Sequence, residues 1–130
     1  MKKIFFSILV LIIYGCQVSD TTYELPANYV YEEEGGYANI VVRDHKLIIG
    51  HGAFDYSVDE NYIMFVYDTT DVINQPKKID NEKLFFLVHC IKKDSLSKVM
   101  SFEEYRNFVS LNKILRTDDL SIRDYSKYAE

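Results

Sequence analysis

Apolar residues alternate with polar ones, or form short continuous blocks, over most of the chain between residues 28 and 93. Turn residues separate these blocks, and the pattern predicts strands over 28–34, 37–44, 46–50, 53–57, 62–69 and 83–93. Gly35-Gly36 and Asp44-His45 are typical of tight turns, so consecutive strands are expected to pair antiparallel. The expected sheet is a meander of five to six strands.

The hydrophobic period changes after residue 100. Ser101 is followed three residues later by Glu104, the spacing of a capping box at a helix start. Apolar residues then recur at helical spacing: Phe102, Tyr105, Phe108 and Val109. One C-terminal amphipathic helix is therefore predicted to pack on one face of the sheet, which gives an α+β fold. Residues 116–130 are mostly polar and are predicted to form a loose tail or a short frayed helix.

The two strongest predicted strands, 62–67 and 84–91, are apolar on both faces. Because one helix covers only one face of a sheet, the other face needs a second cover. Either the sheet curls over that face itself, or the face meets a partner. The second alternative gives a possible interaction face opposite the helix, made of Tyr62, Met64, Val66, Phe85, Leu87 and His89.

The N-terminus has the order of a secretory signal. Lys2-Lys3 precedes an apolar run from Ile4 to Ile13, and small residues follow. A helix of about eleven residues reaches about 16 Å, whereas the hydrocarbon core of a bilayer is about 30 Å thick, so the run is too short to span it. A buried core element and a signal cut by an ordinary signal peptidase are the alternatives.

Four residues at the end of this run, Ile13, Tyr14, Gly15 and Cys16, resemble the lipobox of bacterial prolipoproteins. The lipobox is an aliphatic, a variable and a small residue before an obligatory cysteine. The resemblance implies a diacylglycerol thioether on Cys16, cleavage before it and acylation of the new amino group. Two or more acyl chains give stable attachment, so the lipid bilayer is the first expected partner.

The lipobox divides the chain into four parts. Residues 1–15 become the signal peptide, 16–22 the lipidated tether, 23–115 the α+β domain and 116–130 the tail. The expected location is the bacterial cell envelope. The residue that follows the cysteine is Gln17 and not an aspartate. This favours the outer membrane over the inner one in an organism that has both.

Charge narrows the list of partners. Loss of residues 1–15 removes two lysines and no acids, and the formal net charge goes from −5 to −7. An acidic domain without a basic run argues against nucleic acid as a partner. Once Cys16 is acylated, Cys90 is the only thiol left, so no intramolecular disulfide is expected.

Two groups of residues are candidates for a chemical site. His45, His51, Asp55 and nearby Asp59 lack the spacing of a metal-binding motif, and solvated turn residues are the simpler interpretation. His89 and Cys90 are strand neighbours whose side chains point to opposite faces, so they cannot act together as base and nucleophile. No metal, cofactor or catalytic residue is predicted.

Two compositional features remain. The acidic runs at 32–34 and 118–119 lack the glycine of a calcium loop and indicate solvated turns. The chain has 11 tyrosines and no tryptophan. Tyrosines on a sheet are suited to a half-buried strand, or else line a binding face.

Four stretches taken in order resemble an uncharacterised family of small bacterial lipoproteins, domain of unknown function 3997: "YELPANYVYEEEGGYANIVV", "DENYIMFVYD", "KLFFLVHCIKKD" and "SFEEYRNFVSLNKI". The resemblance covers residues 23–115 and implies no activity or catalytic residue. The expected function is that of a membrane-anchored binding module with an envelope protein partner. An envelope inhibitor or immunity-type protein is the alternative, followed by a small envelope enzyme.

Overall fold

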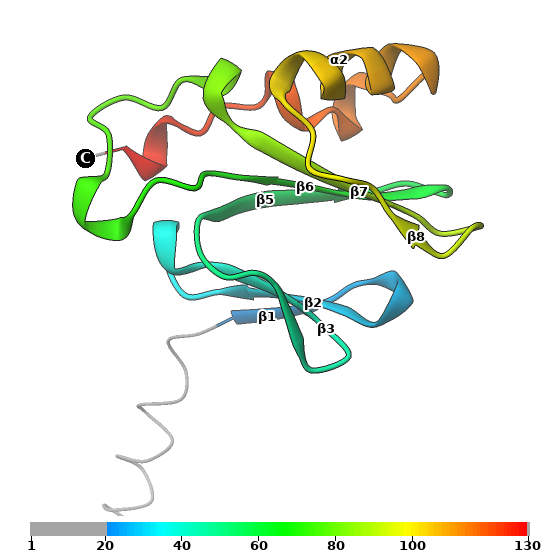
Figure 1. The fold of residues 1–130 in the computed structure, drawn as a ribbon, viewed down its shortest axis with the longest axis horizontal. Helices are drawn as coiled ribbons and strands as arrows, with labels where there is room; N and C mark the ends of the chain where they lie inside the picture. The colour runs from blue at the N-terminus through cyan, green and yellow to red at the C-terminus, as the bar shows by residue number, and fades with distance from the viewer. Residues whose placement is uncertain (1–20, 130) are drawn as a thin grey trace, which may run out of the picture.

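The computed structural model describes residues 21–129 (Figure 1). The predicted signal peptide, the lipobox and Cys16 lie outside the described residues. The fold is α+β, as predicted, with two antiparallel four-stranded sheets and one α-helix within the described range. The prediction of a single sheet of five to six strands was wrong.

Within each of the two sheets, strands that are consecutive in sequence pair with each other. Sheet A has the order β1-β2-β3-β4, and its strands are Thr21–Glu24, Tyr29–Glu33, Ile40–Arg43 and Lys46–Ile49. Sheet B has the order β5-β6-β7-β8, and its strands are Ala53–Val58, Tyr62–Tyr67, Phe85–Cys90 and Ser95–Leu96. The predicted strands match β2 to β7, while β1 and β8 were not predicted.

The elements form three layers (Figure 1). Helix α2, Phe102–Leu111, covers one face of sheet B, and sheet A lies on the other face. Sheet B is therefore the middle layer, which explains why β6 and β7 are apolar on both faces. The chain does cover the second face itself, but with a separate sheet and not by curling one sheet into a half-barrel.

Gly52 lies where the chain passes from sheet A to sheet B. Its N–H donates to Tyr37 O at 2.8 Å, and its carbonyl accepts from Asp68 N–H at 3.0 Å. Its φ is +69°, and a Cβ here would collide with the carbonyl oxygen of Asp68. Only glycine combines this backbone conformation with so close an approach of two chain segments.

The core between sheet B and α2 is rich in aromatic rings. Phe86 and Tyr105 stack at 4.1 Å between centroids, and the Ser101 hydroxyl accepts from Glu104 N–H at 3.2 Å, as the predicted helix cap requires. The buried members of this helix-side core are Tyr37, Phe54, Met64, Val66, Leu84, Phe86, Val88, Tyr105, Val109, Leu120 and Tyr125.

A second core fills the space between the two sheets. Its buried members are Tyr29, Tyr31, Val41, Ile49, Ala53, Ile63, Phe65 and Leu87. Buried tyrosine hydroxyls need partners in such a place. The Tyr31 hydroxyl donates to Ala53 O at 2.6 Å and so ties β2 to β5.

The segment after α2 is not the loose tail that its polar composition predicts. It forms short 3-10 turns at Arg116–Asp118, Leu120–Ile122 and Ser126–Tyr128. Leu120 and Tyr125 are buried in the helix-side core, so the domain extends to at least residue 128. At the other end, β1 begins at Thr21, which places the first two domain residues inside the predicted 16–22 tether.

Candidate functional site: a tyrosine groove between two sheet edges

The predicted interaction face does not exist as a surface. Met64, Val66, Leu87 and His89 are all buried, and Tyr62 and Phe85 are partly buried. The pairing of β6 with β7 explains the error, because Met64 pairs with Val88 and Phe65 with Leu87. The six residues therefore divide between the helix-side core and the space between the sheets.

The histidines and carboxylates weighed as a metal site take separate partners. His51 Nε2 is 3.4 Å from Thr69 O, while Asp55 is bonded to Arg123. Within residues 21–129, no three histidine, cysteine or acidic side chains are grouped to hold a metal ion.

His89 lies between the sheets and makes contacts with sheet A. Its Nδ1 and the Tyr29 hydroxyl are hydrogen-bonded at 2.9 Å. Its Nε2 lies 3.0 Å from Asp94 Oδ1, in a geometry that leaves the nitrogen without a hydrogen bond. Cys90, by contrast, is a free half-buried thiol that pairs with Tyr62 in the ladder.

Arg43 completes this polar cluster. Its guanidinium donates to Asp94 Oδ1 at 2.6 Å and lies 5.0 Å from the centre of the Tyr29 ring. Burial, together with the nearby Arg43 charge, lowers the pKa of His89, and Asp94 only partly opposes this. The cluster links β2, β3 and the β7–β8 turn, and a neutral His89 suits it best.

The best candidate for a functional site is a groove where β1 and β5, the edge strands of sheets A and B, lie side by side. We call it the tyrosine groove, and it has a volume of about 360 Å³. It is lined by Tyr23, Tyr31, Glu33, Phe54, Asp55, Tyr56, Arg123, Lys127 and Tyr128.

Three tyrosines form its wall. The ring centroids of Tyr23 and Tyr56 are 6.0 Å apart, and those of Tyr31 and Tyr56 are 5.0 Å apart. Tyr31 is buried, whereas Tyr23 is 38% exposed and Tyr56 is half-buried. Burial raises the pKa of Tyr56, so its hydroxyl stays protonated at neutral pH and is available to hydrogen-bond.

A bulge in β5 shapes the floor of the groove. The register of the β5–β6 ladder shifts between Ala53 and Asp55, which leaves Phe54 as the extra residue. Phe54 turns into the helix-side core, and Asp55 faces Arg123 at 2.9 Å. The chain thereby places a fixed ion pair beside the aromatic wall.

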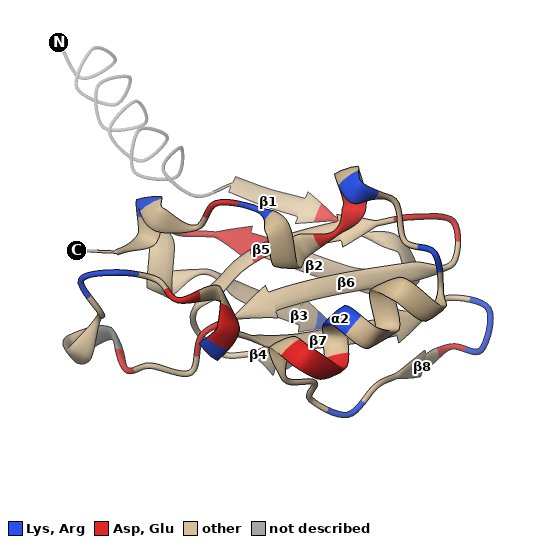
Figure 2. Ribbon diagram, turned by 90° about the horizontal axis from the view of Figure 1, so that it is seen from above, with Lys and Arg blue, Asp and Glu red and all other residues tan. Residues whose placement is uncertain are grey.

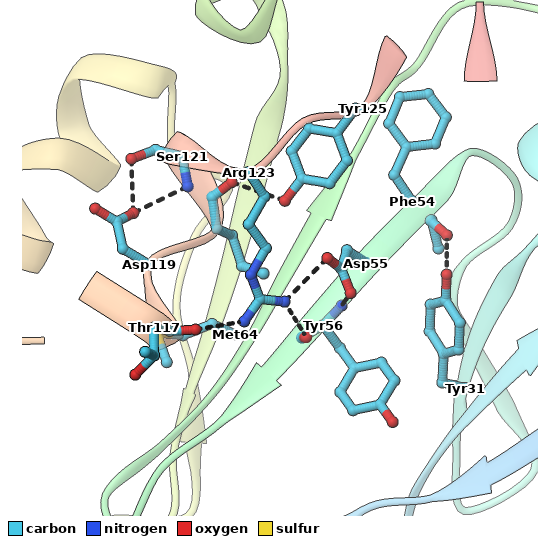
Figure 3. Close-up of polar contacts among 12 residues, drawn as sticks. Tyr31, Phe54, Asp55, Tyr56, Met64, Thr117, Asp119, Ser121, Arg123 and Tyr125 are labelled. Carbon is cyan, nitrogen blue, oxygen red and sulfur yellow. Dashed lines mark hydrogen bonds and ion pairs between the residues drawn. The ribbon is translucent and has the colours of Figure 1, made fainter. Parts of the chain in front are cut away.

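The C-terminal segment closes the edge of β5 (Figure 3). The Arg123 guanidinium donates to Asp55 Oδ2 and to Tyr56 O, and its other terminal nitrogen donates to Thr117 O at 2.8 Å. Further along, the Tyr128 hydroxyl donates to Phe54 O at 2.9 Å. Two edge carbonyls of β5 thus receive side-chain donors, which is one way in which proteins blunt a sheet edge.

The edge of β1 has no such cover. All four of its residues are exposed. Among residues 21–129, its backbone makes no hydrogen bond outside the ladder with β2. An open edge strand presents free N–H and C=O groups to any extended chain that reaches it.

Glutamates surround this open edge. Glu24 ends β1, which is red at that end in Figure 2, and Glu32, Glu33 and Glu34 follow on and after β2. Thr22 pairs with Glu32 and Tyr23 with Tyr31. Because strand side chains alternate, Glu24 and Glu32 lie on the outer face of sheet A, and Tyr23 and Glu33 lie on the groove side.

The groove offers stacking, hydrogen bonds and charge. Its polar lining consists of tyrosine hydroxyls, the Asp55–Arg123 ion pair, Glu33 and Lys127. Sequence reasoning identified the abundance of tyrosine but missed Tyr23, Tyr128 and Arg123 as neighbours. A single arginine in a polar stretch carries no pattern, and only the fold brings it to β5.

Comparisons with protein families, with curated proteins and with solved structures find no match for this chain. Within the described range, the structure contains no helix with the length and apolar character needed to cross a bilayer.

Proposed function

We propose that this chain is a membrane-anchored lipoprotein of the bacterial cell envelope, and that its domain is a binding module which recognises its partner through the tyrosine groove. The observation that carries the binding role is the groove itself. It combines part-exposed aromatic rings with charged groups at a sheet edge, the composition typical of interface anchors.

The anchoring role rests on the lipobox resemblance of residues 13–16. Four residues lie between Cys16 and Thr21, the first residue of β1, and the five Cα–Cα steps that join them span at most about 18 Å. A lipid on Cys16 therefore keeps the groove close to the bilayer surface. Gln17 favours the outer membrane where there are two.

The alternative of an envelope enzyme has little support. It needs at least two of His45, His51, Asp55 and His89 in one cleft. Asp55 is bonded to Arg123, His51 lies beside Thr69 O, and His89 is buried against Tyr29.

An inhibitor or immunity-type protein is a special case of the binding module. The four glutamates around β1 favour it, because they suit a target with a basic groove. Identification of the partner as a secreted hydrolase or toxin would select this alternative.

The anchor is tested by intact mass. Wild-type protein and the Cys16→Ser variant are purified from bacterial membranes in detergent. The expected wild-type mass is that of residues 16–130 plus acyl chains, and the variant should lose both the acyl mass and the membrane association. A full-length, unmodified wild-type mass would contradict the lipoprotein assignment.

The groove is tested by crosslinking in intact cells. A photoreactive phenylalanine analogue replaces Tyr56 in the groove or, as the control, Leu111 on α2, which is 82% exposed. The Tyr56 probe should give a discrete adduct that the Tyr23→Ser change removes, and the Leu111 probe should not. Equal labelling at both positions, or an adduct indifferent to Tyr23, would overturn the proposal.

A further inference from the structure

The backbone of β1 is the most prominent unused feature beside the groove. Its four residues are exposed, and within the described range only β2 pairs with them. The neighbouring edge of β5 is capped by Arg123 and Tyr128. An extended chain therefore has one free edge to pair with on this side of the molecule, and that edge belongs to sheet A.

Charge indicates what kind of chain fits there. Four glutamates lie on β1, on β2 and directly after β2. The groove lining has two basic side chains: Arg123 is bonded to Asp55, and Lys127 Nζ lies 4.9 Å from the centre of the Tyr128 ring. The balance at the edge is acidic. A basic segment is attracted to it, while a second copy of this chain would bring the same glutamates against it.

The alternation of β1 sets a pattern for the occupant. On the groove side, every second residue of an added strand would lie next to Tyr23 and Tyr56. On the outer face, the intervening residues would lie next to Thr22 and Glu24, with Glu32 one strand further. Cross-strand pairs of this kind favour apolar side chains on the first set and lysine or arginine on the second.

We propose that β1 receives an extended, basic segment of a partner protein as a fifth strand of sheet A, with alternate apolar residues in the tyrosine groove and alternate basic residues along Glu24 and Glu32. The inference rests on the proposed function, because it names the partner class for the same groove. Backbone pairing supplies affinity, and the two side-chain sets supply specificity.

The test uses defined peptides and the full chain in detergent micelles. The probe is a blocked, fluorescent eight-residue peptide of alternating lysine and valine. One control peptide has glutamate in place of lysine, and a second is N-methylated at consecutive residues, so that neither edge of the extended peptide can form an unbroken ladder. Fluorescence polarisation of the peptide measures Kd. Changes in the NMR chemical shifts of the backbone amides of Thr21 to Glu24 show whether the peptide binds at β1.

The lysine peptide should bind at least tenfold more tightly than either control and should shift the β1 amides. The double change Glu24→Gln and Glu32→Gln should weaken binding severalfold and flatten its salt dependence. The matched double change Glu60→Gln and Glu103→Gln removes two exposed carboxylates elsewhere and should have no effect.

Other outcomes overturn the inference. Binding that survives N-methylation means that no strand is added. Binding of the glutamate peptide, or dimerisation of the protein through β1 in sedimentation, means that the occupant is not basic. If groove crosslinking in cells still depends on Tyr23, the binding module stands and only the basic strand fails. If it does not, the proposed function fails as well.

Discussion

The edge strands β1 and β5 lie side by side in this domain, but among the described residues only β5 has its edge covered by another segment of the chain. The C-terminal segment crosses the edge of β5 and supplies donors to Phe54 O and Tyr56 O. The edge of β1, which Tyr23 brings within aromatic contact of β5, keeps its backbone groups exposed. An exposed sheet edge promotes aggregation. Because the chain covers the β5 edge and leaves the β1 edge open, the β1 edge is the candidate for binding.

The contrast also concerns what each edge is built to do. The β5 edge is fixed by contacts within the domain and has no free backbone acceptor at Phe54 or Tyr56. The β1 edge is flanked by acids and lies next to the part-exposed Tyr23 and Tyr56. Charge is itself a protection against unselective pairing, and it favours a chain of opposite charge.

The largest effect on the difference between the two edges is expected when the C-terminal segment, which covers the β5 edge, is loosened. Leu120 is fully buried in the helix-side core, and Leu120→Ala should destabilise the protein by about 2–5 kcal/mol in urea unfolding. Hydrogen exchange should then accelerate at β5 more than at β1. Leu111→Ala, at an exposed position of α2, is the control and should have little effect. Equal effects of the two changes would mean that the segment does not hold the β5 edge.

A narrower change removes only the cap. Arg123→Ala deletes the ion pair to Asp55 and the donor to Tyr56 O, and should reduce the unfolding free energy by about 1–2 kcal/mol, because the pair is a third exposed and partly screened. Arg123→Lys should recover only part of this loss, since lysine lacks the two-pronged donor. Arg116→Ala, at an exposed site nearby, should be neutral in the same urea titration.

A fall in pH is expected to destabilise the domain through the buried His89 and not through either sheet edge. Burial lowers the pKa of His89, so the unfolded chain binds its proton more readily than the folded one. The stabilisation is complete above the unfolded value near 6.5 and is lost as the pH falls below it. Unfolding free energies between pH 8 and pH 5 should show this loss equally in wild type, Arg123→Ala and Tyr23→Ser. His89→Gln should flatten it; an unchanged profile in that variant would remove His89 as the cause.

The smallest effect on stability is expected at the open edge. Tyr23 is more than a third exposed on a terminal strand, so Tyr23→Ser should cost less than about 1 kcal/mol. The same change should abolish groove crosslinking. A large loss of stability would show that Tyr23 serves the fold and would weaken its assignment as a binding residue.

The sequence predicted most strands because their apolar spacing is a local property. It correctly indicated that 62–67 and 84–91 are covered on both faces, yet it gave the wrong cover for the second face. Periodicity shows which residues of one strand share a face but not which strands join the same sheet. The register that pairs Met64 with Val88 is set by contacts far apart in sequence, and the predicted interaction face failed for that reason.

The candidate site was less accessible to prediction. Arg123 and Tyr128 reach β5 only because Leu120 and Tyr125 are held in the helix-side core. Leu120 lies in one 3-10 turn and Tyr125 directly precedes another, so the two residues belong to no long hydrophobic period. The polar composition therefore concealed a segment that packs tightly.

Pairing of consecutive strands within each sheet has a consequence for how the chain folds. The connections within sheet A are short and close at low entropic cost, whereas residues 68–84 form a long connection between β6 and β7. We therefore expect sheet A to form early. We expect the docking of the two sheets on each other around Gly52 to be the slower event. If the chain is made and exported from its N-terminus, sheet A is complete first, and its inner tyrosines await a cover that only later synthesis supplies.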